Sequence, residues 1–255
     1  MIREAFTKGK RYIGYLTAGD GGVTRSKEMA LAMIDGGVDL LEIGLPFSEP
    51  VADGPVIRGA VERALKAGTS PGDVLVVADE IRKVSTVPIL IMTYYNPILS
   101  GGLAFLREAK RVGVNGLLIV DLPPEEAGEY LSLMKEVRLE TVFLVAPSTP
   151  PERVPLICRV SSGFVYYACR KGTTGMRKGY SDDLSEKVAM IRSHTDLPVA
   201  VGFGVASADT AEKILRSADG FIVGSLFVDT AHRAKDPVEL TRVVASLDPR
   251  EKGYR

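Results

Sequence analysis

The sequence predicts an α/β protein in which residues 1–255 form one domain, a single (β/α)8 TIM barrel. Short apolar runs rich in β-branched residues alternate eight times with helical stretches, and no shift in composition divides the chain. The length also fits, because such barrels have about 250 residues. A doubly wound open sheet is the alternative, but eight similar units favour a closed barrel.

The predicted strands are nearly all apolar, as expected for parallel strands that are buried on both faces. They comprise residues 12–17, 40–44, 88–93, 116–120, 141–145, 164–168, 199–202 and 221–223.

Capping signals mark the helices between these strands. Residues 70–71 and 236–237 each pair an N-cap side chain with a proline at the first helical position. Residues 149–152, Thr-Pro-Pro-Glu, are similar to a capping box. Glycines at 36–37 and at Gly113 should end helices just before the next strand.

Three additions to the simple barrel are predicted. An extra N-terminal segment, residues 1–11, precedes the first strand, and an extra helix over residues 56–67 follows the second. After the sixth strand, residues 170–179 are polar, glycine-rich and cationic, which predicts a long loop. Long loops at the C-terminal rim of a barrel are usually functional.

Composition excludes several classes of partner. Lys+Arg and Asp+Glu both number 32, with no basic cluster, so neither nucleic acid nor an anionic membrane is expected. Residues 1–11 have no apolar region, so a signal peptide is not expected, and no apolar stretch reaches about 18 residues, so a membrane span is not expected either. Two cysteines need no bridge, so a reducing, cytoplasmic location is expected. With only two histidines besides, no metal site is expected.

Two carboxylates near the end of the second strand are the first catalytic candidates. Glu42 lies between Leu41 and Ile43 in a strand that should be dry, so its pKa should be raised, as suits a proton donor. The alternative is a buried Glu paired with a structural Lys or Arg. Asp53 precedes Gly54 and would face Glu42, or would simply be the N-cap of the extra helix.

Glycines after the seventh and eighth strands indicate a phosphate site. Residues 202–204 (Gly202, Phe203, Gly204) and residues 224–225 (Gly224, Ser225) would let backbone N–H groups approach an anion. Phosphate sites at these two strands recur in barrel enzymes, although plain turns are the alternative. A Schiff-base role for Lys171 is disfavoured, because an exposed loop would not depress its pKa. No nucleophile elbow supports serine chemistry.

The segment 41–54 resembles the signature of the tryptophan synthase alpha-subunit family, and the likeness covers essentially the whole chain. Further matching motifs, in the family's order, are residues 16–20, 92–97, 120–123, 172–175, 202–204 and 224–225.

This resemblance implies a lyase that cleaves indole-3-glycerol phosphate to indole and D-glyceraldehyde 3-phosphate in tryptophan biosynthesis. Glu42 would be the acid that protonates indole C3, Asp53 would stabilise the charge on the ring nitrogen, and Tyr166 would position the glyceryl chain. Further residues that the resemblance assigns to substrate binding are Tyr15, Tyr94 and Leu122 in the indole wall and Thr174 and Gly175 in the closing loop.

The family's partner is the tryptophan synthase beta subunit, in an alpha2beta2 assembly. Pyridoxal phosphate belongs to that subunit, so no cofactor is expected in this chain. The surface that should meet the partner comprises Pro46, Phe47, Ser48, Glu49 and Arg170.

Two other functions remain open. Indole-glycerol-phosphate synthase and phosphoribosylanthranilate isomerase are also phosphate-binding barrels, but they need a lysine or a different acid/base pair at strand ends. The chain could instead be an inactive subunit that only activates a partner, although Glu42, Asp53 and Tyr166 are all in place.

Overall fold

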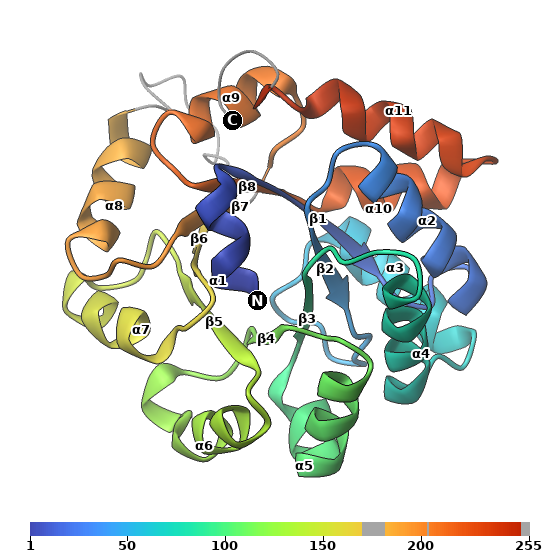
Figure 1. The fold of residues 1–255 in the computed structure, drawn as a ribbon, viewed down its shortest axis with the longest axis horizontal. Coiled ribbons are helices and arrows are strands. Elements are labelled where there is room, and N and C mark those ends of the chain that lie inside the picture. The colour runs from blue at the N-terminus through green and yellow to red at the C-terminus, as the bar shows by residue number, and fades with distance from the viewer. Residues whose placement is uncertain (170–181, 203, 251–255) are drawn as a thin grey trace.

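The computed structural model describes residues 1–169, 182–202 and 204–250 (Figure 1). Eight parallel strands pair in chain order and close into a barrel, with β1 hydrogen-bonded to β8. The strands are β1 (Arg11–Thr17), β2 (Leu40–Gly44), β3 (Ile89–Thr93), β4 (Gly116–Ile119), β5 (Glu140–Val145), β6 (Val165–Ala168), β7 (Val199–Gly202) and β8 (Gly220–Val223). All eight predicted strands are confirmed to within one residue at each end, and closure rules out the open sheet.

The helices of the described chain lie around this barrel, except α1, which lies at its N-terminal end (Figure 1). They are α1 (Ile2–Ala5), α2 (Val23–Asp35), α3 (Pro55–Lys66), α4 (Pro71–Arg82), α5 (Tyr95–Arg111), α6 (Gly128–Val137), α7 (Val154–Val160), α8 (Asp182–Arg192), α9 (Ala208–Leu215), α10 (Ser225–Arg233) and α11 (Pro237–Leu247). Short 3-10 helices are η1 (Phe6–Lys8), η2 (Pro124–Glu126) and η3 (Pro151–Arg153). The extra helix expected after the second strand is α3.

Two of the predicted N-caps are confirmed. The side chain of Ser70 accepts from the N–H of Asp73, whose carboxylate accepts from Ser70 in return, and Asp236 accepts from the N–H of Val238. The capping box predicted at residues 149–152 is wrong. The hydroxyl of Thr149 instead accepts from the N–H of Ala146 at 2.8 Å, which closes a turn back toward β5, so η3 begins without a side-chain cap.

Alternation along the strands produces two apolar cores. Side chains that point outward pack against the helices, whereas those that point inward fill the barrel. The buried inward residues are Ile13, Leu40, Leu90, Leu118, Val142, Phe164, Ala200 and Ile222, together with Ile2 from α1.

Helix α1 closes the N-terminal end of the barrel, and Figure 1 shows it across the centre of the ring of strands. The side chain of Ile2 belongs to the interior core. Glu140, at the start of β5, accepts hydrogen bonds from the N–H groups of Ile2 and Arg3 and so satisfies the first donors of the helix. The predicted N-terminal extra segment is therefore a plug for the barrel.

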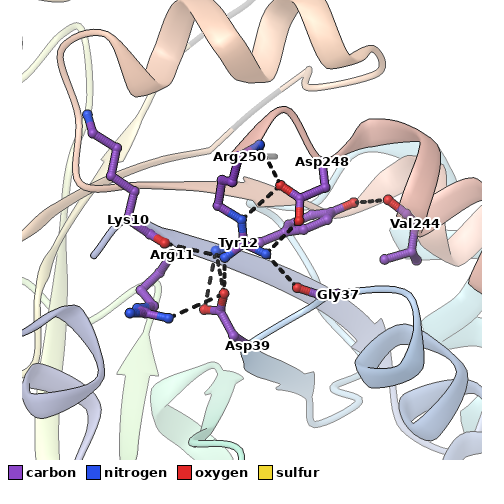
Figure 2. A network of polar contacts seen from close by, with 8 residues as sticks. All are labelled: Lys10, Arg11, Tyr12, Gly37, Asp39, Val244, Asp248 and Arg250. Atoms are coloured by element: carbon purple, nitrogen blue, oxygen red, sulfur yellow. Dashed lines mark hydrogen bonds and ion pairs between the residues drawn. The ribbon is translucent and has the colours of Figure 1, made fainter. Parts of the chain in front are cut away.

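Arg250, which follows α11, fastens the end of the described chain to the starts of β1 and β2 (Figure 2). Its guanidinium donates to both carboxylate oxygens of Asp248 at 2.8 and 2.7 Å and to the carbonyl of Gly37 at 2.7 Å, and it also bonds Asp39. It lies 5.6 Å from the centre of the Tyr12 ring, within the range of a cation–π contact. Only 13% of the Arg250 side chain is exposed, so these bonds are largely sheltered from water.

Replacing Arg250 by alanine should lower the free energy of unfolding by about 3 kcal/mol, because Asp39 and Asp248 would lose the cation that offsets their burial. Urea unfolding of Arg250→Ala measures this. Arg107→Ala is the control, because the Arg107–Glu136 pair is exposed and should contribute less than about 1 kcal/mol. Equal losses in the two variants would contradict a special role for Arg250.

Candidate active site

A pocket of about 330 Å³ lies at the C-terminal end of the barrel. Its polar lining comes from β1, β2, β6, the loop after β2 and the start of α10, in the form of Tyr15, Glu42, Asp53, Tyr166 and Ser225. Its remaining lining is mostly apolar and comprises Ala52, Gly54, Ile57, Met92, Leu118, Val120, Leu144, Ala168, Gly204, Val205, Ala206, Ile222, Gly224 and Leu226. The closed barrel therefore gathers side chains from distant parts of the chain into one hollow.

Strand alternation explains why Glu42 points into this hollow. Its neighbours Leu41 and Ile43 belong to the outer core against the helices, so Glu42 faces the barrel axis with Leu40 below it. In the strand register, Glu42 lies opposite Tyr15 of β1 on one side and Leu90 of β3 on the other.

Glu42 is buried without a counter-ion. It is 1% exposed, no described Lys or Arg forms an ion pair with it, and its Oε1 has no hydrogen-bond partner among the described residues. Burial, and then the charge of Asp53, raises the pKa of Glu42 to about 8. The carboxyl is therefore protonated at neutral pH, and the alternative of a structural ion pair has no support in the described chain.

Asp53 is a carboxylate in different surroundings. The N-cap of α3 is Gly54, so the alternative that Asp53 caps this helix is wrong. The half-buried carboxylate instead accepts a hydrogen bond from the hydroxyl of Tyr94 at 2.9 Å. The pKa of Asp53 is raised above its ordinary value, because burial outweighs the Tyr94 bond and the positive charge of Arg58, which both lower it. Two carboxyls with unequal surroundings thus share the pocket, as acid/base chemistry requires.

Two tyrosines fill the space beside these carboxyls, each over a glycine of an adjacent strand. A Cβ on Gly44 would lie 2.1 Å from the hydroxyl oxygen of Tyr15, and a Cβ on Gly202 would lie 2.2 Å from that of Tyr166. Glycine at these two positions therefore makes room for the phenols. Burial raises the pKa of both hydroxyls, so both remain neutral donors.

The glycine-rich elements after β7 and β8 also line the pocket. Gly204 has a φ of +71°, a conformation that favours glycine, and lines the pocket in the loop that leads to α9. Gly224 is the N-cap of α10 and Ser225 its first residue, so the first N–H groups of this helix lie at the pocket. No lysine or arginine is among the described residues of the lining.

Several predicted residues lie elsewhere. Phe203, Arg170, Lys171, Thr174 and Gly175 fall outside the described residues. The four predicted partner contacts of the loop after β2 precede Asp53, with Ser48 and Glu49 exposed, Phe47 half-buried and Pro46 buried.

Tyr94 and Leu122 are not among the residues that line the pocket. Both follow the last paired residue of a strand, β3 and β4 respectively. Leu122 lines a neighbouring hollow of about 230 Å³ with Phe143. The apolar lining of the pocket comes from inward residues that sequence analysis missed, chiefly Met92, Leu118, Val120, Leu144 and Ile222. Every second residue of a strand faces the same side of the sheet, so extending that pattern from an inward residue of each strand predicts most of these positions.

Among the described residues, no group of three or more His, Cys, Asp or Glu side chains could hold a metal ion. Within the same residues, no helix is long and apolar enough to cross a membrane.

A closed barrel whose strand ends surround two unlike carboxyls places the chain among the (β/α)8-barrel enzymes. More narrowly, the chain belongs to the tryptophan synthase alpha chain family, whose sequence profile matches residues 3–251. The tryptophan synthase alpha chain of Coxiella burnetii (strain Dugway 5J108-111) is 44% identical over 254 residues, which are 100% of this chain and 95% of that protein.

Solved structures agree with this placement. A chain of ligand-free tryptophan synthase from M. tuberculosis superposes with a TM-score of 0.88 at 35% identity, over 97% of each chain. A chain of the tryptophan synthase α2β2 complex of Pyrococcus furiosus gives a TM-score of 0.85 at 38% identity, over 94% of this chain and 98% of that one.

The pKa of Glu42 makes stability depend on pH. Its native value of about 8 exceeds the ordinary 4.5, so the carboxyl contributes stability fully below 4.5 and loses it as the pH rises through 8. Relative to Glu42→Gln, the wild type should therefore lose roughly 4 kcal/mol of unfolding free energy between about pH 5 and pH 9. Urea unfolding at both pH values measures the gap. A gap that does not change with pH would show that Glu42 titrates normally.

Proposed function

We propose that this chain cleaves indole-3-glycerol phosphate to indole and D-glyceraldehyde 3-phosphate. The observation that carries the proposal is the pair formed by Glu42, a protonated buried carboxyl, and Asp53, a carboxylate with hydrogen-bonding and cationic neighbours, in one sheltered pocket. The membership of the chain in the tryptophan synthase alpha chain family supports the same reaction.

The reaction needs an acid and an anion at different places on the indole ring. Glu42 gives its proton to indole C3, which leaves the ring nitrogen positively charged, and Asp53 stabilises that charge. The bond between C3 and the glyceryl carbon then breaks, and its electron pair returns to the ring. The glyceryl hydroxyl next to that bond loses its proton to the Glu42 carboxylate as the aldehyde forms, so the acid is regenerated.

Other parts of the pocket would bind the rest of the substrate. Met92, Val120 and Leu144 offer the apolar wall that the indole ring needs. Tyr166 and Tyr15 would position the glyceryl chain and the ring. Backbone groups at Gly202, Phe203, Gly204, Gly224 and Ser225 would hold the phosphate. Thr174 and Gly175 would belong to the loop that covers the bound substrate.

The product indole would be passed to a tryptophan synthase beta subunit. The similar P. furiosus protein is part of an α2β2 complex, and an equivalent assembly is proposed here through Pro46, Phe47, Ser48, Glu49 and Arg170. Pyridoxal phosphate would be bound by the partner, because the cleavage itself needs only acid, base and an anion. Indole crosses membranes, so direct transfer in the cytoplasm would prevent its loss.

The alternative barrel reactions are less well supported. Those enzymes rely on a lysine or another acid/base pair, and no lysine ends any of the eight described strands or lines the pocket. The other alternative, an inactive subunit that only activates a partner, predicts no indole release and is tested by the measurement described next.

Glu42→Gln should lower the rate of indole release from indole-3-glycerol phosphate by about a thousandfold, because the proton donor is lost. Asp53→Asn should lower it by about a hundredfold, because charge stabilisation is lost. Release is followed with and without a beta subunit, and activation of that subunit should survive in Glu42→Gln. Glu140→Gln, a buried acid at the other end of the barrel, should retain the rate. Absence of indole release by the folded wild type would contradict the proposed reaction.

A further inference from the structure

The position of Tyr94 is not explained by the substrate pocket. It is only 3% exposed, it does not line the pocket, and it follows directly after β3 as the N-cap residue of α5. Its phenol reaches instead toward the loop after β2, where it meets Asp53.

Three contacts fix this phenol in the loop. Its hydroxyl accepts from the N–H of Ala52 at 3.0 Å and donates to Oδ2 of Asp53 at 2.9 Å. Its ring lies 5.3 Å from the ring of Phe47. Because one hydroxyl both accepts and donates, the backbone before Asp53 and the carboxylate itself are held by the same oxygen atom.

Asp53 needs such support because its own segment has no helix or strand. Residues 45–54 belong to no helix or strand, and the N–H of Asp53 donates to the carbonyl of Pro50 within that loop. Among the described residues, the Tyr94 hydroxyl is the side chain that donates a hydrogen bond to this carboxylate. Tyr94 lies between β3 and α5, so its backbone is held by regular structure on both sides. A hydrogen bond from this residue therefore restricts the orientation of the Asp53 side chain.

The bond to Tyr94 occupies only one oxygen of the carboxylate. Oδ2 is taken by Tyr94, whereas Oδ1 accepts no hydrogen bond from any residue in the described part of the chain. A carboxylate held at one oxygen presents the other to a donor in the pocket. This is the arrangement needed by a group that must meet a ring N–H in one orientation.

We propose that Tyr94 is a positioning residue that orients Asp53 toward the substrate through the bond to Oδ2. This inference rests on the proposed function, in which Asp53 faces the indole nitrogen. It gives Tyr94 a role different from a place in the indole wall.

The test is Tyr94→Phe, which removes one oxygen atom and retains the ring that packs on Phe47. The kcat for indole release should fall roughly ten- to hundredfold with little change in KM. The acid limb of the pH profile should move to higher pH, because the ionised form of Asp53 loses a hydrogen bond. In an Asp53→Asn background, Tyr94→Phe should cost little more, because the carboxylate that it serves is gone.

Tyr12→Phe is the matched control. It also removes a buried tyrosine hydroxyl, which donates to the carbonyl of Val244 at the opposite end of the barrel, so it should reduce stability without moving the pH profile. A Tyr94→Phe variant with the wild-type acid limb would overturn the inference. So would an equal loss in the wild-type and Asp53→Asn backgrounds, since a purely structural role predicts that result.

One measurement separates this inference from the proposed function. The carboxyl carbon of Asp53 is titrated by NMR in the wild type, Tyr94→Phe and Tyr12→Phe, without substrate. A higher pKa in Tyr94→Phe alone supports the inference even if no substrate is cleaved. An unchanged pKa overturns it even if indole release is confirmed.

Discussion

The pairing of β1 with β8 is the constraint on which both the core and the pocket depend. The two strands are joined in parallel from Arg11 opposite Gly220 to Gly14 opposite Val223. This closure removes sheet edges and leaves an interior that only side chains can fill. Ile13 and Leu40 occupy its lower part, so water is displaced well before the level of Glu42. The apolar interior at the N-terminal end and the open pocket at the C-terminal end therefore both follow from the closure of the barrel.

Burial separates the properties of the two carboxyls. Glu42 belongs to a strand and cannot leave the interior, so its ionised form is penalised by the loss of water. Asp53 belongs to a loop and has a hydroxyl donor and the charge of Arg58 nearby, so its ionised form is favoured by neighbours that Glu42 lacks. Two carboxyls with unlike surroundings thus share one pocket because the backbone places them at different depths.

The two ends of the barrel carry different tasks. At the N-terminal end, the plug formed by α1 with Glu140 and the bonds of Arg250 satisfy charges and backbone groups, which favours stability. At the C-terminal end, Glu42 has an oxygen without a hydrogen bond from the described chain, and Gly204 and Gly224 leave backbone exposed. Polar groups that lack a hydrogen-bond partner lower the stability of the fold. Here they lie at the pocket, where a ligand can form hydrogen bonds with them.

The sequence by itself determined the eight strands, the extra helix α3 and the carboxyl pair, because strand alternation, proline and glycine signals and a Glu among apolar residues act locally. It also determined the N-caps at Ser70 and Asp236, but not the turn that engages Thr149. Only the tertiary structure decided that Gly202 accommodates Tyr166 and that Tyr94 turns toward Asp53. Such contacts join residues from different βα units, and the distance between them exists only once the barrel has closed.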